Sequence, residues 1–195
     1  MTPKEVILVG GGARSGKSDL ALSLARGRGA RRVFLATAEA RDEEMRERIA
    51  RHRSDRGPDF ETLEVPLDVP ATLLRLDADV VVIDCLTLWI SNLLCRGDSQ
   101  ADVARSVEAL AAALGRRAFD VIVVTNEVGM GLVPETELGR AFRDATGIAH
   151  QRIARMADRI YFGALGTMLR LKPSPIAFVG KANDEAPPSE GWTCS

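Results

Sequence analysis

Short runs of apolar and β-branched residues recur along the chain, and longer stretches with helical spacing lie between them. None of the runs alternates with polar residues, which is typical of strands that are buried on both faces of a parallel sheet. The runs cover residues 6–9, 33–36, 80–83, 121–124 and 160–162. Strands that alternate with helices predict a doubly wound α/β fold with right-handed crossovers.

The helical stretches carry apolar stripes of their own. One stripe follows the first strand at Leu20 and Leu24, and a longer one includes Leu138, Phe142, Ala145, Ala149 and Met156. Both predict helices that pack one face on the sheet.

The chain has 195 residues, which is long enough for one buried α/β core and short for two. Its character changes after Lys172, where prolines at 173, 175, 187 and 188 interrupt a polar stretch. We therefore predict one catalytic domain over residues 1–172. Residues 173–195 would form a Pro-rich C-terminal extension that is poorly ordered or docked and carries no chemistry.

The charge and the cysteine content limit the classes of partner and of structural site that we expect. The 26 Lys and Arg residues nearly balance 27 Asp and Glu residues, so no global basic field points to a nucleic acid or a membrane surface. Three cysteines fit neither a disulfide framework nor a zinc site. With neither a signal-peptide pattern nor an apolar stretch of membrane-spanning length, we expect a cytoplasmic protein.

A glycine-rich segment, Gly11-x-x-x-x-Gly16-Lys17-Ser18, follows the first expected strand and opens the first expected helix. Its glycines allow successive backbone N–H groups to face phosphates, and the helix N-terminus adds its positive end. Lys17 can reach the β- and γ-phosphates, and the Ser18 hydroxyl can bind Mg²⁺. The segment predicts a nucleoside triphosphate site and a single-domain P-loop NTPase of the RecA-like type. The alternative is a glycine-rich turn with an incidental lysine.

A carboxylate on the metal side of such a site should end a neighbouring buried strand. Asp84 follows the run at residues 80–83 and meets this condition. Alternatively, Asp84 caps the helix that follows it.

Residues 41–56 read as a helix with an acidic first turn and basic last turns. Met45, Ile49, His52 and Arg56 fall on one face of it. His52 is then either an incidental histidine on a solvated charged helix or a nucleophile. A neutral imidazole can attack phosphorus while nearby arginines stabilise the phosphoryl oxygens. The other histidine, His150, lies in the long amphipathic stretch and is expected to be structural.

Several blocks together resemble the bifunctional adenosylcobinamide kinase / adenosylcobinamide-phosphate guanylyltransferase family of cobalamin biosynthesis. The resemblance runs from about Val6 to Lys172, and His150 stands where we would expect asparagine. The blocks are residues 11–18, Ala36-Thr37-Ala38, Asp42-Glu43-Glu44-Met45 with Arg48-Ile49 and His52, Asp84 to Trp89, Asn92-Leu93-Leu94, Val124 to Pro134, Phe142-Arg143-Asp144 and Gln151-Arg152.

The resemblance implies two reactions that use Mg²⁺ and GTP or ATP. The γ-phosphoryl group goes to the hydroxyl of adenosylcobinamide, and GTP then guanylylates His52, from which GMP moves to the new phosphate. The residues that the resemblance implies hold the triphosphate are Gly11, Gly12, Ala13, Arg14, Ser15, Gly16, Lys17 and Ser18. Further nucleotide contacts would be Thr37, Ala38, Glu39, Arg53, Ser54, Asp55 and Arg56, with Glu64 and Asp84 as acidic neighbours and with Ser18 and Asp84 at the metal.

The segment Asn126 to Gly131 is either a tight turn that needs glycine or a ligand loop at the end of a parallel strand. As a ligand loop it would contact the corrinoid or another subunit, and the resemblance implies a homo-oligomer, a trimer. Two rival functions stay open. One is a single-activity P-loop kinase in which His52 is structural, and the other is a RecA-like ATPase that moves a partner.

Overall fold

A computed structural model describes residues 3–40 and 42–173. Its centre is a seven-stranded sheet in the order β3-β2-β4-β5-β1-β6-β7. The first six strands in this order are parallel, and β7 is antiparallel to β6. The strands are β1 (Val6–Gly11), β2 (Arg32–Ala36), β3 (Glu61–Glu64), β4 (Val80–Asp84), β5 (Asp120–Val124), β6 (Arg159–Ala164) and β7 (Thr167–Lys172).

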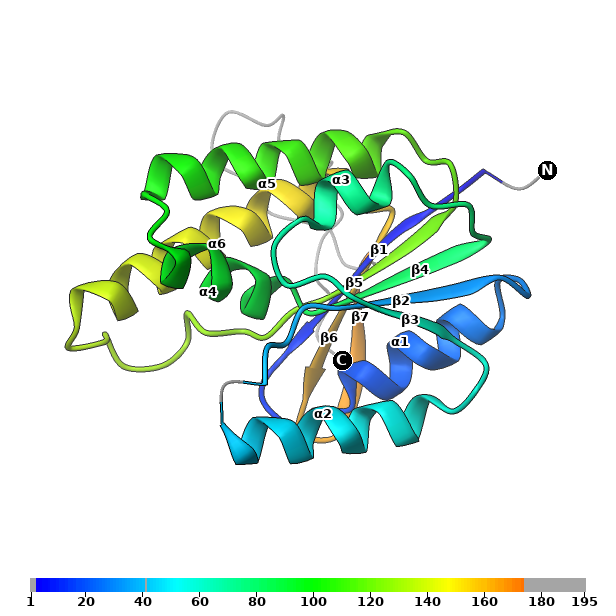
Figure 1. The fold of residues 1–195 in the computed structure, drawn as a ribbon, viewed down its shortest axis with the longest axis horizontal. Coiled ribbons are helices and arrows are strands. Elements are labelled where there is room, and N and C mark those ends of the chain that lie inside the picture. Colours follow the sequence, from blue (N-terminus) through cyan, green and yellow to red (C-terminus); the bar gives the residue numbers. More distant parts are fainter. Residues whose placement is uncertain (1–2, 41, 174–195) are drawn as a thin grey trace, which may run out of the picture.

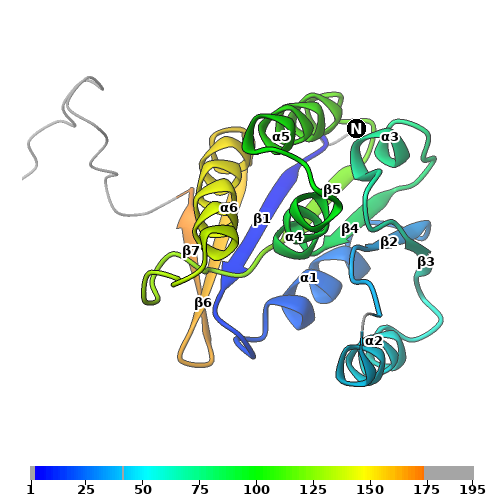
Figure 2. The ribbon, with the colours of Figure 1, turned by 60° about the vertical axis from the view of Figure 1, so that its left-hand side comes forward.

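Helices cover both faces of the sheet, as Figures 1 and 2 show. The helices are α1 (Lys17–Arg26), α2 (Glu43–Arg56), α3 (Val69–Leu73), α4 (Leu86–Arg96), α5 (Gln100–Gly115) and α6 (Glu137–Met156). α1 and α2 lie on one side, and α3 to α6 lie on the other. The mostly parallel sheet between two helical layers confirms the predicted doubly wound α/β class.

The core divides between the two faces because successive side chains of a strand point in opposite directions. Val6 and Leu8 pack with the α3–α6 layer, whereas Ile7 and Val9 pack with α1. This explains why the strand runs are continuously apolar: both faces of β1, β2, β4 and β5 are covered.

All five predicted strands form, but β3 and β7 were not predicted. β3 is a four-residue edge strand with glutamate at both ends, so it has no apolar run. β7 is largely exposed, and a tight turn at Leu165 and Gly166 joins it to β6. Both turn residues have positive φ, 51° and 75°, as a two-residue hairpin loop requires.

The long predicted stripe forms α6, but Leu138 does not belong to its buried face. Leu138 is 54% exposed at the first turn, while Ala145, Ala149 and Ile153 are buried. The last predicted feature, the extension after Lys172, lies outside the described residues apart from Pro173. Within the described part of the chain, no helix has the length and apolar character that crossing a bilayer requires.

Candidate active site

The glycine-rich segment connects β1 to α1 at the carboxyl edge of the sheet. Gly11 has a φ of 147°, and a side chain there would come within 2.6 Å of the Gly163 carbonyl oxygen on β6. Gly16 is left-handed, with a φ of 82°, at the position just before α1. Two glycines are therefore required for conformation and close approach, and the loop ends on a helix N-terminus, as a phosphate site demands.

Lys17 and Ser18 begin α1 and face the cavity. The Lys17 side chain is only 7% exposed, and its Nζ donates to the Gly12 carbonyl at 2.7 Å. The Ser18 hydroxyl donates to Oδ2 of Asp84 at 2.9 Å. Asp84 is thus brought beside the phosphate loop from β4, one strand away from β1 across β5.

Asp84 does not cap the following helix. The N-cap of α4 is Cys85, and no side chain makes a capping bond there. Burial raises the pKa of the Asp84 carboxyl, while the Ser18 hydrogen bond and the charges of His52, Lys17 and Arg56 oppose this shift. A hydroxyl beside a carboxylate suits Mg²⁺, which takes few protein oxygens and completes its shell with phosphates and water. No cluster of three or more His, Cys, Asp or Glu residues forms a separate metal site within residues 3–40 and 42–173.

One cavity of about 530 Å³ joins the phosphate loop to α2. Residues 13–19 line one side, and Glu47, Arg51, His52 and Arg56 line the other, with Phe34 and Asp84 between them. A smaller hollow of about 70 Å³ adjoins it and shares His52, Lys17 and Asp84. It adds mainly apolar surface, from Ala36, Ala38, Met45, Ile49, Cys85 and Leu88, together with Asn126.

The predicted face of α2 forms. Asp42 caps the helix by accepting from the Met45 N–H at 2.7 Å. Met45, Ile49 and His52 are half-buried and Arg56 is buried. His52 therefore points inward toward the same cavity as the phosphate loop, rather than into solvent.

Other predicted contacts fall outside the cavity walls. Thr37 is fully buried, and its hydroxyl bonds the backbone of Cys85, accepting from N at 2.7 Å and donating to O at 2.8 Å. Arg53, Ser54 and Glu64 are exposed and line neither hollow, and the same walls omit Glu39. The Asp55 side chain is outside the described part. Of the positions predicted after β2, only Ala38 lines a hollow.

Glu47 and Arg51 also line the cavity but were not among the predicted nucleotide contacts. They sit four residues apart and so share a face, but that face is turned away from the stripe that contains His52. Helical spacing from His52 therefore does not find them. Asn92 was also missed: its side-chain amide donates to the carbonyls of Thr37, at 2.7 Å, and Pro66, at 3.1 Å, and so ties α4 to the ends of β2 and β3.

Cys85 lies in the smaller hollow but is not a nucleophile. Burial, with a smaller contribution from the Asp84 charge, raises the pKa of its thiol to about 11. The thiol is therefore protonated at neutral pH, which disfavours thiolate chemistry here. Asn126 sits above it and donates to the Thr87 hydroxyl at 3.0 Å.

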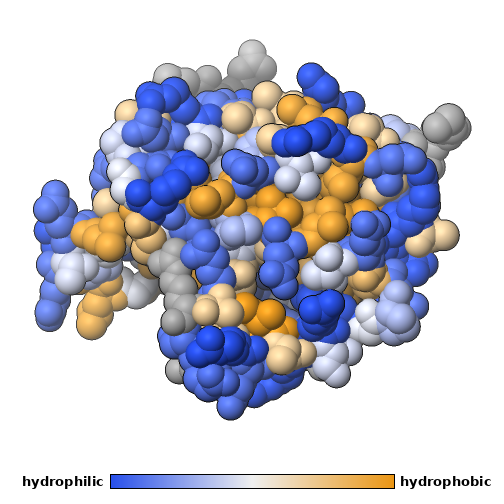
Figure 3. Space-filling view, in the orientation of Figure 1, coloured by the Kyte–Doolittle hydropathy of each residue, from blue (hydrophilic) through white to orange (hydrophobic). Residues whose placement is uncertain are grey.

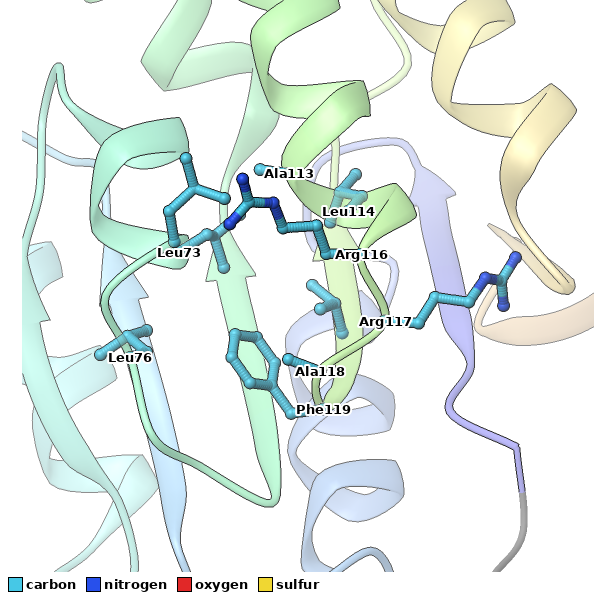
Figure 4. A pocket seen from close by; sticks show the side chains of 10 residues that line it. Leu73, Leu76, Ala113, Leu114, Arg116, Arg117, Ala118 and Phe119 are labelled. Atoms are coloured by element: carbon cyan, nitrogen blue, oxygen red, sulfur yellow. The ribbon is translucent and has the colours of Figure 1, made fainter.

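A further hollow of about 90 Å³ lies at the amino edge of the sheet, opposite the phosphate loop. Figure 4 shows Leu73, Leu76 and Phe119 around it, with Arg116 at its rim and Arg117 pointing away. Its walls are apolar side chains and arginines, with no group suited to acid–base or nucleophilic chemistry. Of these three hollows, only the two at the carboxyl edge of the sheet are lined by reactive groups.

Comparisons with known proteins agree with this geometry. Residues 7–171 match the family model described as cobinamide kinase / cobinamide phosphate guanyltransferase. The bifunctional adenosylcobalamin biosynthesis protein CobP of Pseudomonas aeruginosa is 44% identical over 173 residues, which are 87% of this chain and 98% of that protein. The corresponding CobU of Salmonella typhimurium is 35% identical over 181 residues, 86% of this chain and 99% of that one.

Solved structures show the same fold at much lower identity. The flagellar accessory protein FlaH of Methanocaldococcus jannaschii aligns with a TM-score of 0.50 at 16% identity, covering 87% of this chain and 79% of FlaH. A type III secretion ATPase from pathogenic bacteria aligns with a TM-score of 0.52 at 12% identity, covering 84% of this chain and 52% of that one. These likenesses confirm the P-loop NTPase fold.

Proposed function

The chain belongs to the cobinamide kinase / cobinamide phosphate guanyltransferase family, and from this premise we propose that both reactions take place at the cavity between the phosphate loop and α2. It is a bifunctional enzyme of cobalamin biosynthesis, a kinase and a guanylyltransferase. We propose adenosylcobinamide and its phosphate as the substrates, GTP as the guanylyl donor, and ATP or GTP as the phosphoryl donor.

The first reaction transfers a phosphoryl group. The hydroxyl oxygen of the substrate attacks the γ-phosphorus, the bond from that phosphorus to the β–γ bridging oxygen breaks, and the hydroxyl proton is released. Lys17 lies at the start of α1, where its ammonium can neutralise charge on the β- and γ-phosphates. Bound through Ser18 and Asp84, Mg²⁺ would supply further charge neutralisation on the phosphate oxygens.

The second reaction uses His52 as a nucleophile. A neutral ring nitrogen attacks the α-phosphorus of GTP, the α–β bridging bond breaks, and pyrophosphate leaves. A phosphate oxygen of the phosphorylated substrate then attacks the phosphorus of the P–N bond, which gives the GDP-linked product and frees the imidazole. Covalent catalysis of this kind replaces one displacement between two anions with two easier steps.

Two arginines of α2 that line the cavity suit this step. Arg51 and Arg56 line the cavity on either side of His52, and phosphoryl oxygens gain negative charge in the transition state. Arg53 and Ser54, which were predicted as nucleotide contacts, line neither hollow, so we assign the arginine role to Arg51 and Arg56, which line the cavity.

The observation that carries the proposal is the shared cavity. A triphosphate held by the loop on one wall would have His52 on the facing wall, with Asp84 between the two walls. This arrangement supports a chemical role for His52 over the alternative left open by the sequence, an incidental histidine on a solvated helix.

Incubation with GTP labelled at the α-phosphate tests the proposal. The wild type should acquire label that is labile in acid and stable in alkali, and His52→Ala should acquire none while it still phosphorylates adenosylcobinamide. His150→Ala is the matched control, because it removes the other histidine of the chain and should keep the label.

Any of three results would contradict the proposal. An active kinase preparation that takes no label would favour a single-activity kinase, and triphosphate hydrolysis with no acceptor would favour a RecA-like ATPase. Loss of both reactions in a folded His52→Ala protein would show that the two roles are not divided as proposed.

A homo-oligomer, by resemblance a trimer, forms part of the same proposal, as does a cytoplasmic location. The loop before α6 exposes Met130, Leu132 and Val133 by 81, 96 and 63%, and Figure 3 shows apolar surface at the left-hand end where this loop projects. Neighbouring exposed apolar residues of this kind are typical of an interface.

Sedimentation analysis should give about three times the mass of one chain, and Leu132→Glu should lower this sedimenting mass. A wild type that sediments as a monomer would contradict this part.

A further inference from the structure

Among the α2 side chains that the structure describes, Arg56 is the only buried one. Met45, Ile49 and His52 are half-buried, and the others are exposed. The helix is therefore held to the protein mainly through the residue at its carboxyl end, since a half-buried stripe of two apolar residues is a weak attachment. Whatever holds Arg56 also fixes the direction of α2.

The Arg56 guanidinium lies on the face of the Phe34 ring. Its Cζ is 3.9 Å from the ring centroid, and Phe34 is 3% exposed in the middle of β2. An arginine stacked on an aromatic face gains both a cation–π attraction and flat contact. Because β2 pairs with β3 and β4 on its two sides, the Phe34 ring is mounted on the sheet itself.

Two further contacts surround this stack. The edge of Phe60 meets Phe34, with centroids 6.5 Å apart and planes at 88°. Arg26, at the end of α1, donates to the Arg56 carbonyl at 3.2 Å and lies 5.8 Å from the Phe60 ring. Helix α2 then stops at Gly57, whose φ of 67° turns the chain toward β3. Two elements, β2 through Phe34 and α1 through Arg26, thus clamp one end of α2, and Phe60 packs against both clamping residues.

His52 lies one turn before Arg56 on the same face, and both line the two hollows at the site. Four residues of helix advance the axis by about 6 Å, so a shift or rotation at Arg56 passes directly to the imidazole. In-line attack needs the reacting atoms within about 3.5 Å, and a misplacement of about 1 Å can cost roughly 100-fold in rate.

We propose that Phe34 is a positioning residue for guanylyl transfer. It holds the Arg56 guanidinium on its ring and so aims His52 at the phosphate-loop cavity from a helix that is otherwise loosely attached. This inference rests on the proposed role of His52 as the guanylylated residue. Phosphoryl transfer to the substrate hydroxyl does not use the imidazole, so that step depends on the clamp much less.

Phe34→Leu is the test variant, and Phe119→Leu is its matched control. Phe119 is similarly buried, at 6%, but lies next to the amino end of β5, away from the cavity. Relative to Phe119→Leu, Phe34→Leu should lower the rate of His52 labelling by GTP roughly 10-fold to 100-fold more than it lowers the rate of phosphoryl transfer to adenosylcobinamide. Phe34→Tyr, which keeps an aromatic face, should restore most of the labelling rate.

A second readout does not depend on the chemistry. Amide hydrogen exchange across α2 should be faster in Phe34→Leu than in Phe119→Leu, with α1 unchanged between them. Arg56→Lys keeps the charge but loses the planar face, so it should show the same faster exchange even if Phe34→Leu does not fold. Unchanged exchange in α2, or a labelling loss no larger than in Phe119→Leu, would overturn the proposal. A wild type that takes no label would contradict the proposed guanylylation of His52. The hydrogen-exchange comparison would still test whether the contact between Phe34 and Arg56 holds α2 in place.

Discussion

The two walls of the cavity are built in opposite ways. The phosphate loop follows β1, whose residues 6–9 are at most 5% exposed, and leads into α1, which buries Lys17, Ala21, Leu22 and Ala25. The facing wall is α2, a strongly polar helix whose described side chains are nearly all exposed or half-buried. One wall is part of the core, and the other is attached to it at one end.

This difference matches the division of labour that we propose. Both reactions need the triphosphate in a fixed place, and a loop anchored in the core provides that with backbone N–H groups. The reactions differ in which phosphorus is attacked, and only one uses a nucleophile from the protein. Placing that nucleophile on a separate wall allows its loss or displacement to affect one reaction without the other.

Removing the Lys17 charge from the phosphate-loop wall of the cavity should have the largest effect. Lys17→Ala is expected to lower both phosphoryl transfer and His52 labelling by about 100-fold to 1000-fold, because a preorganised positive charge is lost from the transferring phosphates in each case. Rates of both reactions at saturating nucleotide measure this. His52→Ala, by contrast, should remove only one of them.

Lys4→Ala is a suitable control for the lysine substitution. Lys4 lies at the amino edge of the sheet, 3.9 Å from the Asp120 carboxylate, so its loss should leave both rates near those of the wild type. If Lys17→Ala impaired only one reaction, the idea that one phosphate cradle serves both would be wrong.

The phosphate-loop wall could be predicted from the sequence because the features that define it are local. The positive φ of Gly16, the strand before the loop and the helix after it all lie within a short segment, and each has its own residue signature. Asp84 was also predictable, since the carboxyl ends of parallel strands meet at one edge of a sheet.

The second wall could be predicted only in part. The spacing of Met45, Ile49, His52 and Arg56 gave the inward face of α2, but not the partner of that face. The contact between Arg56 and Phe34 joins residues 22 positions apart, and Phe34 looked like any other strand residue. Attachment of a polar helix depends on tertiary contacts that helical periodicity does not encode.

Thr37 shows the opposite difficulty. The family resemblance implied that Thr37, at the end of the second strand, contacts the nucleotide, and the structure has its hydroxyl bonded to the Cys85 backbone. A polar residue at the carboxyl edge can face either the ligand or the neighbouring strand. Sequence position gives the edge, and only the packing of β2 against β4 gives the direction.

The smallest effect concerns the second histidine, His150, which lies on α6 in the helical layer opposite α2. His150 Nε2 is 2.7 Å from the Thr125 hydroxyl, and its Nδ1 is 3.9 Å from the Glu127 carboxylate. Burial lowers the pKa of His150, and the Glu127 charge opposes this only in part. The folded protein therefore binds this proton less readily than the unfolded chain does.

The sign of the pH dependence follows from this difference. As the pH falls below about 6.5, the ordinary pKa of histidine, the unfolded chain takes up the proton first and the folded state loses stability. His150→Gln cannot titrate, so its free energy of unfolding should fall less than that of the wild type between pH 7.5 and 5. Parallel urea titrations across this pH range measure the difference between the two proteins in the free energy of unfolding. The free energy of unfolding could instead fall equally in the two proteins, or fall less in the wild type than in the variant. Either result would mean that the Glu127 carboxylate offsets or outweighs burial and that the pKa of His150 is not lowered.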